Sequence, residues 1–294
     1  GTTSTDPYRF KIATYNTLIS VKQKDVVHDV RTIKNTIGFD VIALQENYSD
    51  SRRAYMMKTL ACDSCSLAGY TVNGRGKEEL MIFWKKSRFE LLQSGSIKTS
   101  DKYTERGRTF PALHLNYVRL KVLGTNPELQ IIVADNHLPS LVDRDDDGKP
   151  NWKLLPKRVA AYQQHMANVN AQIKTWKSNF PGTPIFIGGD YNVNYRKDKR
   201  VKAAIFPTES FAKVGGKSNW QQTSFDTKQP GATTFKPIVP IKGQPKNRLI
   251  DYVYSVDNGS GVTLRSTVIR YKNLHSDHHA VRATYELPKP AETQ

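Results

Sequence analysis

Residues 39–46 read Phe-Asp-Val-Ile-Ala-Leu-Gln-Glu, a continuous apolar run that ends in two polar side chains. A short run without polar alternation is typical of a strand buried on both faces of a sheet. Residues 22–37 carry apolar side chains at helical spacing and are followed by a glycine, which predicts an amphipathic helix. Residues 9–15 alternate like a strand and end at Asn16. We therefore expect an α/β protein in which Asn16 and Glu46 both follow the ends of strands.

The rest of the chain repeats this pattern without a low-complexity linker. Residues 228–245 are rich in glycine and proline, which predicts a loop. We expect a single domain at 9–287, with polar tails at 1–8 and 288–294. Further strands are predicted at 79–85, 89–94, 113–123, 129–136, 184–188, 248–255 and 278–286, and a long helix at 156–177.

Polar side chains suited to chemistry occur repeatedly where a predicted strand begins or ends. Each one alone is equally typical of a turn or a solvated surface position. Loops at one edge of a sheet, however, gather such residues into a single cleft. Carboxylates and amide oxygens suit Mg²⁺, Mn²⁺ or Ca²⁺, and imidazoles act as acids or bases near neutral pH. These are the requirements of metal-assisted phosphodiester hydrolysis, and the candidates are Asn16, Glu46, His137, Asp190, Asn192, Asp251, Asp277 and His278.

Six short segments resemble the endonuclease/exonuclease/phosphatase superfamily, in that family's order and spacing. They are Ile12-Ala-Thr-Tyr-Asn16, Ile42-Ala-Leu-Gln-Glu46, Asn136-His137-Leu138, Gly189-Asp190-Tyr-Asn192, Leu249-Ile-Asp251-Tyr-Val and Ser276-Asp277-His278-His-Ala-Val281. The resemblance spans residues 9–286. It implies a four-layer α/β/β/α sandwich, with two mixed β-sheets packed face to face, helices outside and the active cleft at one edge.

The resemblance also implies a role for each matching residue. Glu46 resembles the principal metal ligand, with Asn16 and Asp277 beside it and Mg²⁺ or Mn²⁺ as the cofactor. Asp190 would align or activate water, while Asn192 would orient the phosphate. The catalytic pair is Asp251 and His278, in which the carboxylate keeps the imidazole cationic, and His137 would be the acid for the leaving oxygen.

The stretch 74–84, Gly-Arg-Gly-Lys-Glu-Glu-Leu-Met-Ile-Phe-Trp, resembles deoxyribonuclease I, which carries a glutamate just before an alternating strand. By that alignment Glu78 would pair with His137; the alternative is a charged strand entry. The groove-reading arginine usual in deoxyribonuclease I is displaced here to Arg52 or Arg53. We predict a deoxyribonuclease I-like endonuclease acting on DNA. The alternatives are a sphingomyelinase-like phospholipid phosphodiesterase or an inositol-phosphate phosphatase, and then a nucleic-acid-binding protein without catalysis.

The charge supports a polyanionic partner. The 294 residues include 44 Lys and Arg against 27 Asp and Glu, a net charge of +17. Nucleic acid is the first candidate and an anionic membrane surface the second, although such charge also simply aids solubility. We expect a monomer that contacts DNA as its substrate, without a stable protein partner and without a membrane. The expected phosphate contacts are Arg75, Lys77, Arg106 and Arg108, with Lys197, Lys199 and Arg200 near the Asp190 loop.

Two further patterns are less specific. The run 143–148, Asp-Arg-Asp-Asp-Asp-Gly, matches the first half of a calcium loop, but Leu154 stands where the bidentate glutamate belongs. An acidic turn is therefore preferred over a partial calcium site at Asp143, Asp145 and Asp147. Cys62 and Cys65 have the spacing of a local disulfide or of two free thiols. We favour the disulfide, and with it an exported protein.

Overall fold

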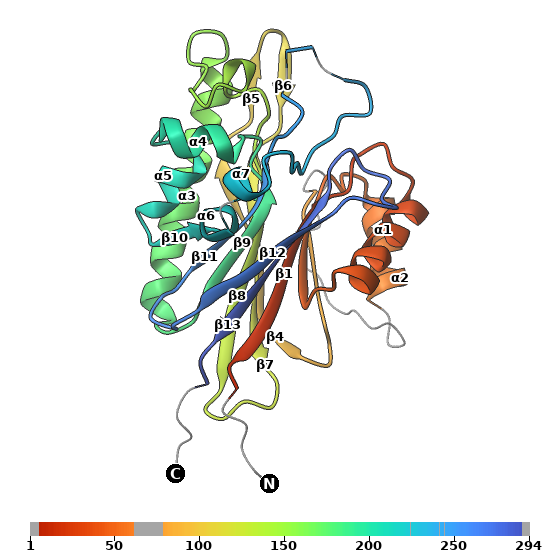
Figure 1. Cartoon of the computed structure of the whole chain (residues 1–294), viewed down its shortest axis with the longest axis vertical. Helices are drawn as coiled ribbons and strands as arrows, with labels where there is room; N and C mark the ends of the chain where they lie inside the picture. The colour runs from red at the N-terminus through yellow and green to blue at the C-terminus, as the bar shows by residue number, and fades with distance from the viewer. Residues whose placement is uncertain (1–5, 62–78, 224, 241, 244, 290–294) are drawn as a thin grey trace.

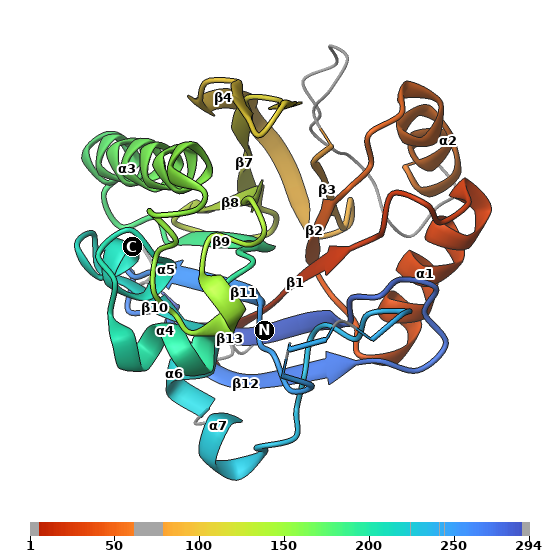
Figure 2. The same ribbon diagram turned by 90° about the horizontal axis from the view of Figure 1, so that it is seen from above.

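Two β-sheets pack face to face in the computed structural model, which describes residues 6–61, 79–223, 225–240, 242–243 and 245–289. Helices cover both outer faces (Figures 1 and 2). The strand order is β12-β13-β1-β2-β3 in the first sheet and β10-β11-β9-β8-β7-β4 in the second. Each sheet mixes parallel and antiparallel pairs. The predicted four-layer α/β/β/α sandwich is confirmed.

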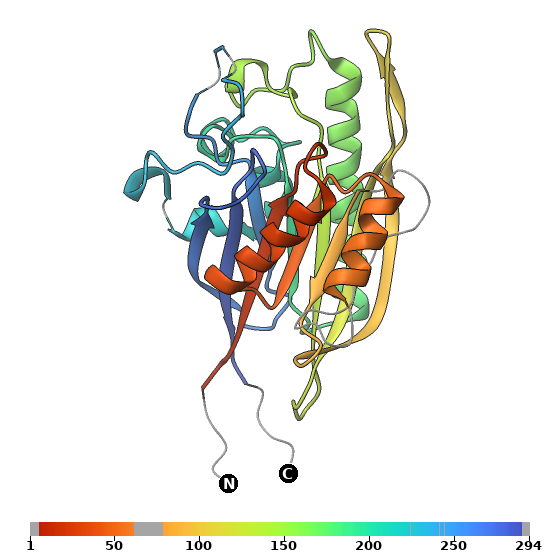
Figure 3. The ribbon, with the colours of Figure 1, turned by 90° about the vertical axis from the view of Figure 1, so that its right-hand side faces the viewer.

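The first sheet joins the two ends of the chain. Its central strand β1 runs parallel to β2 and antiparallel to β13. Two helices, α1 (Gln23–Thr36) and α2 (Asp50–Leu60), lie over its outer face (Figure 3). The strands are β1 (Tyr8–Asn16), β2 (Val41–Gln45), β3 (Met81–Trp84), β12 (Thr263–Arg270) and β13 (Ala280–Leu287).

The second sheet carries the long helix α3 (Pro156–Asn179) and several short helices on its outer face. Its strands are β4 (Phe89–Ser100), β7 (Leu113–Val122), β8 (Leu129–His137), β9 (Ile185–Asp190), β10 (Gly216–Ser218) and β11 (Asp251–Val256). The short helices are α4 (Tyr195–Val201), α5 (Pro207–Ala212), α6 (Asn219–Thr223) and α7 (Phe225–Lys228), with a 3₁₀ turn at Arg144–Asp146. A separate hairpin consists of β5 (Tyr103–Glu105) and β6 (Arg108–Phe110).

Three apolar layers hold these four layers together. The layer between the sheets includes Phe10, Val133 and Phe186, all fully buried. A second layer packs the six-stranded sheet against α3 and the short helices, and a third packs the five-stranded sheet against α1 and α2. Each fully buried aliphatic or aromatic side chain contributes about 1.5–3 kcal/mol relative to exposure. Within the described ranges, no helix combines the length and apolar character needed to cross a bilayer.

Several short elements were not predicted, and for the longest two, β12 and α2, the structure gives a physical reason. Strand β12 has a register shift between Leu264 and Ser266, which interrupts the alternation that marks a strand. Helix α2 buries Arg52 and Arg53 together with Met56 and Leu60, so its inner face does not read as apolar. The predicted strands at the sheet centres are present, with boundaries moved by a few residues.

The parallel pairs bring the predicted polar residues to one edge. In β1 and β2, Asn16 pairs with Gln45, the residue before Glu46. In β8 and β9, His137 pairs with Asp190, and Asp190 in turn pairs with Asp251 of the antiparallel strand β11. The strand ends of both sheets therefore meet above the same side of the sandwich (Figure 1).

We expect Gly189→Ala to lower the free energy of unfolding by about 1–3 kcal/mol, the usual cost of overpacking. An added Cβ at Gly189 would overlap the Asn136 carbonyl oxygen and come within 2.7 Å of its Nδ2. Thermal and urea unfolding measure the loss. Gly231→Ala is the matched control, because its Cβ would meet nothing within 4 Å. Equal stability of the two variants would contradict the close approach of β8 and β9.

Candidate active site

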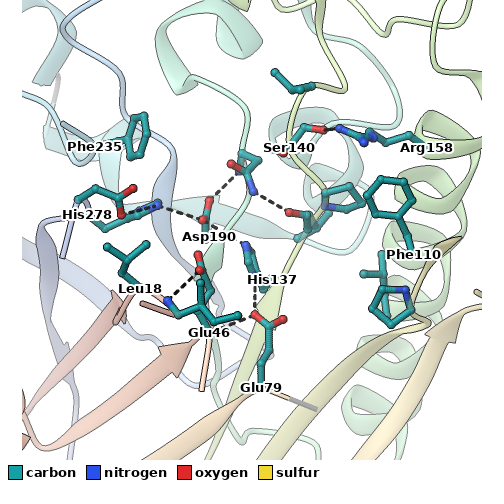
Figure 4. Close-up of a pocket in the computed structure, with 18 of the residues that line it drawn as sticks. Leu18, Glu46, Glu79, Phe110, His137, Ser140, Arg158, Asp190, Phe235 and His278 are labelled. Atoms are coloured by element: carbon teal, nitrogen blue, oxygen red, sulfur yellow. Dashed lines mark hydrogen bonds and ion pairs between the residues drawn. The ribbon is translucent and has the colours of Figure 1, made fainter. Parts of the chain in front are cut away.

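A cavity of about 830 Å³ opens at the edge where the strand ends meet (Figure 4). It is lined by residues far apart in the sequence. Asp251 does not line the cavity but is hydrogen-bonded to His278, which does. The lining includes the predicted residues Glu46, His137, Asp190, Asn192, Asp277 and His278.

Asp190 is at the centre of the cluster and is only 1% exposed. Its Oδ2 lies 3.4 Å from His137 Nε2 and 3.5 Å from His278 Nε2, and it accepts a 3.0 Å hydrogen bond from Asn16 Nδ2. Burial opposes ionisation, but the two imidazoles and the Asn16 amide outweigh it and lower the pKa of Asp190. Asp190 is therefore a carboxylate facing two cationic rings.

His278 is held by Asp251 on its other side. Its Nδ1 lies 2.8 Å from Asp251 Oδ2 and 3.1 Å from Oδ1, and the ring is 4% exposed. Burial favours the neutral ring, yet the charges of Asp251 and Asp190 raise the pKa of His278 to about 9. The Ser276 hydroxyl donates to the Asn16 carbonyl at 2.7 Å, which fixes the loop that carries the imidazole. This arrangement matches the predicted pairing.

His137 has the same arrangement with a different carboxylate from the one predicted. Its Nδ1 contacts Glu79 Oε1, and its Nε2 faces Asp190. Burial alone would lower the pKa of His137. The charges and hydrogen bonds of Glu79 and Asp190 outweigh burial, so the pKa of His137 lies well above the ordinary histidine value. Glu78 lies outside the described residues, and the partner is its neighbour Glu79. Glu79 is held by the backbone, because Asn47 N–H donates to the Glu79 carbonyl at 3.0 Å.

Glu46 follows β2 in a left-handed backbone conformation, with φ of 66°. This conformation costs a non-glycine residue about 1–3 kcal/mol and is common at functional sites. Its Oε2 accepts a 2.5 Å hydrogen bond from Asn16 Nδ2, the same nitrogen that contacts Asp190. The side-chain oxygen of Asn16 accepts a 3.0 Å hydrogen bond from the Leu18 backbone N–H. Asn16, predicted as a metal ligand, thus joins two carboxylates while its oxygen is engaged by the backbone.

Two buried arginines position the loops after Asn16 and Glu46. The Arg52 guanidinium donates to the carbonyls of Leu18 and Ile19, at 3.0 and 3.1 Å. Arg53 donates to the carbonyls of Asn47 and Tyr48, at 2.7 and 2.9 Å. Neither arginine is available to read a groove, because both are about 5% exposed. Their role is to hold the backbone around the cleft, which sequence periodicity could not indicate.

Asn192 and Asp277 lie at the rim of the same cluster. Asn192 has φ of 53°, its backbone N–H donates to Asp190 Oδ1 at 3.0 Å, and its amide donates to the Leu138 carbonyl at 2.7 Å. Its side-chain nitrogen is therefore used to fix the loop. Asp277 Oδ1 lies 4.0 Å from His278 Nε2. Burial, together with the charges of Glu46 and Asp190, raises the pKa of Asp277 in spite of His278.

Buried polar groups also support the floor of the cleft. Gln45 Nε2 donates to Thr14 Oγ1 and to Asp135 Oδ1, which ties the first sheet to the second. Burial raises the pKa of Asp135 well above its ordinary value. Asn136 donates to the Gly188 carbonyl at 3.1 Å, and this bond fixes β8 against β9 just below Asp190. None of these contacts follows from the strand pattern.

The side chains present fit a hard divalent cation. Among the described residues, a carboxylate oxygen of Glu46 lies within 4.8 Å of one of Asp190, and so does a carboxylate oxygen of Asp251. The convergence of Glu46 and Asp190 on one amide nitrogen leaves excess negative charge facing the cavity. Carboxylate oxygens are the ligands preferred by Mg²⁺ and Mn²⁺. Asp277 lines the same cavity as a further carboxylate.

The acidic run 143–148 makes local contacts of its own. Asp143 accepts from Gly148 N–H at 3.2 Å, Asp147 accepts from Lys149 N–H at 2.8 Å, and the Asp145 side chain is 79% exposed. The remaining acid, Asp146, is bonded to Arg248 at 3.1 Å. Asp143 and Asp147 are thus used in turn contacts and Asp146 in a distant ion pair, and the partial calcium site stays a prediction.

Of the expected phosphate contacts, Arg108 lines the cavity and Arg106 lies in the exposed turn between β5 and β6. Lys197 packs against Gly148. The cavity lining does not include Lys197, Lys199 or Arg200. The other expected residues, Arg75 and Lys77, lie outside the described ranges, as do Cys62 and Cys65.

Comparison with solved structures identifies the fold. The chain superposes on D. rerio TDP2 complexed with a single-strand DNA product with a TM-score of 0.63, 15% identity, and coverage of 94% of this chain and 98% of that one. An endonuclease/exonuclease/phosphatase family protein from Bacteroides thetaiotaomicron gives 0.63 at 14% identity, covering 95% and 98%. The human Nocturnin catalytic domain gives 0.62 at 14% identity, covering 95% and 94%. No family model and no curated protein matches the sequence.

We expect Asp251→Asn to lower the pKa of His278 well below 9, because the carboxylate is the largest influence that favours the cationic ring. Because the pKa of His278 is raised, the stability that its protonation contributes is lost as pH rises from about 6.5 through about 9. The difference in melting temperature between wild type and variant should therefore narrow at high pH. NMR titration of the imidazole in EDTA measures the shift, with the exposed Glu90→Gln as control. An unchanged His278 pKa would contradict the pairing.

Proposed function

We propose, from the endonuclease/exonuclease/phosphatase fold of this chain and the side chains at its cleft, that it is a divalent-metal-dependent phosphodiester hydrolase acting on DNA. The observation that carries the proposal is Asp190 between two imidazoles, each backed by its own carboxylate. A cluster of perturbed titratable groups in a cavity is typical of a catalytic site. Strands of the six-stranded sheet and loops beside strands of the five-stranded sheet supply these residues, so the arrangement is a property of the fold rather than of one loop.

The cation-binding residues would be Glu46 and Asp190, with Asp277 at the rim. A bound Mg²⁺ or Mn²⁺ would offset charge on the phosphate and on the leaving oxygen. Asp190 would accept a hydrogen bond from the attacking water and orient it toward phosphorus. The charge that develops on the phosphate oxygens would face the cationic His278 ring, which Asp251 holds in place.

His137 supplies the proton that the leaving oxygen needs. Glu79 contacts its Nδ1 and leaves Nε2 directed toward Asp190 and the cavity. Because the pKa of His137 is raised, the ring is protonated at neutral pH and can act as a general acid. The overall reaction adds water across one P–O ester bond: hydroxyl goes to phosphorus and the proton goes to the leaving oxygen.

DNA is proposed as the substrate on two grounds. The net charge of +17 favours a polyanion, and Arg108 places a cation on the cavity wall. TDP2, which has the same fold, was solved with a single-strand DNA product. The structural neighbours also include a mannosyl-6-phosphatase, so the fold alone supports phosphoester hydrolysis more broadly than DNA cleavage.

A second candidate is a phospholipid phosphodiesterase, and one observation favours it. Ile238 and Val239 are 74% and 75% exposed in the loop after Phe235, next to the exposed Lys236. Exposed apolar side chains beside basic ones are suited to an anionic membrane surface.

We expect Glu46→Gln and Asp190→Asn to reduce kcat/KM on plasmid or single-stranded DNA by at least about 10²-fold, the usual effect of removing an essential acid–base or metal-side carboxylate. EDTA should abolish wild-type cleavage and Mg²⁺ or Mn²⁺ should restore it. Glu90→Gln, an exposed carboxylate on β4, is the matched control. Variants that cleave at near the wild-type rate would overturn the mechanism.

The same assay separates the two candidates. Purified protein is offered DNA, RNA and sphingomyelin vesicles in parallel, each with Mg²⁺, Mn²⁺ or EDTA. Metal-dependent cleavage of DNA without vesicle hydrolysis supports the first proposal. Hydrolysis of the vesicles without cleavage of nucleic acid would replace it with the second.

A further inference from the structure

The β5–β6 hairpin forms a fixed wall on one side of the cleft. Glu105 at the end of β5 is buried and accepts hydrogen bonds from the backbone N–H groups of Lys157 and Arg158, at 2.8 and 3.4 Å. These donors belong to the first turn of α3, which leaves such N–H groups without helical partners. The carboxylate therefore anchors the hairpin to the long helix.

This wall presents aromatic rings and guanidinium groups to the cavity. Tyr103 and Phe110 are cross-strand partners whose rings stack at 5.0 Å with an interplanar angle of 17°. The guanidinium carbons of Arg158 and Arg108 lie 4.8 and 5.1 Å from the Phe110 ring centroid. Arg158 also donates to the Ser140 carbonyl at 2.8 Å, which fixes its position. All four side chains line the cavity, and both rings are only partly buried.

A second aromatic wall faces it across the carboxylates. Phe235 is bridged through its backbone to Arg248 and His278, and its ring lies 5.0 Å from the His278 ring. The Arg248 guanidinium carbon is 5.6 Å from the centroid of the Phe235 ring. Figure 4 shows Phe235 on one side and Phe110 on the other, with Asp190, His137 and Glu46 between them. A phosphodiester held at the carboxylates thus has an aromatic surface on each side.

We infer that the Tyr103–Phe110 wall is a stacking subsite for an unpaired nucleobase next to the cleaved phosphate. The chain then prefers single-stranded or frayed nucleic acid over intact duplex. The inference rests on the proposed function, because it names which part of a nucleic acid this cleft reads. Aromatic rings and arginine planes bind the exposed face of any base without regard to sequence.

Pairing state decides whether this surface can be used. In a duplex each base face is covered by its neighbours, so a ring beside the scissile phosphate gains a stack only if a base has left the helix. A membrane lipid or a phosphorylated sugar offers no planar ring to Tyr103 and Phe110. Phosphate contacts, by contrast, would be equal for strands with and without bases. The contributions of bases and of phosphates to cleavage can therefore be measured separately.

The test compares kcat/KM in Mg²⁺ for three substrates: a short thymidine strand, an abasic strand of the same length, and a hairpin duplex. We expect wild type to favour the base-bearing strand over the abasic one by at least about tenfold, the effect of one base–aromatic stack. Phe110→Leu keeps an apolar side chain but removes the ring, so the ratio should fall toward one. Phe110→Tyr should retain the ratio. Melting temperatures confirm that both variants fold.

Leu123→Ala is the control, because this residue is also a partly exposed apolar side chain but lies just beyond the opposite end of β7. Equal rates on the base-bearing and abasic strands, or a ratio unchanged by Phe110→Leu, would overturn the subsite while leaving the phosphodiesterase assignment intact. Faster cleavage of the duplex than of the single strand would overturn the preference for unpaired bases. Failure to cleave any strand would remove the proposed function and this inference with it.

Discussion

The structure of the cleft depends on a buried carboxylate, Asp190, that lies between two imidazoles. A buried charge is costly unless it is paired and hydrogen-bonded, and a lone buried carboxylate would simply bind a proton. Here His137 and His278 flank it, and Glu79 and Asp251 back the two rings. His137, Asp190 and Asp251 belong to the six-stranded sheet, whereas Glu79 and His278 come from loops beside strands of the five-stranded sheet. The chain of charges therefore forms only when both sheets are assembled in this register.

That arrangement explains how one cleft can hold several carboxylates and imidazoles in fixed positions. The dipoles and ionised groups are fixed by the fold, so they do not have to reorganise when charge develops on a phosphate. Glu46 adds a carboxylate from a strained backbone position, and Asn16 holds it against Asp190. The aromatic walls at Phe110 and Phe235 lie to either side, where the rest of a substrate would extend. In the proposed function, the catalytic residues and the residues that would bind the rest of the substrate lie in different parts of one cavity.

The sequence predicted what depends on local pattern and on order along the chain. Apolar runs that end in polar residues indicated β1, β2, β8 and β9, and with them Glu46, His137 and Asp190. Contacts between distant segments were not predictable in this way. The contact of Glu79 with His137 and the hydrogen bond from Leu18 N–H to the side-chain oxygen of Asn16 are examples that no pattern reveals. Other elements have no clear apolar periodicity in the sequence. They are β12 with its bulge, α2 with its buried arginines, and the three-residue strands of the β5–β6 hairpin.

The proposed function requires that Glu46 and Asp190, with Asp277 at the rim, hold one divalent cation in the cleft. Anomalous diffraction from crystals soaked in Mn²⁺ tests it most directly, because manganese is located without reference to activity. We predict a manganese peak in the cleft in contact with the Glu46 carboxylate, and its loss in crystals of Glu46→Gln. A cleft without manganese, or a peak confined to surface acids such as those at 143–147, would contradict it.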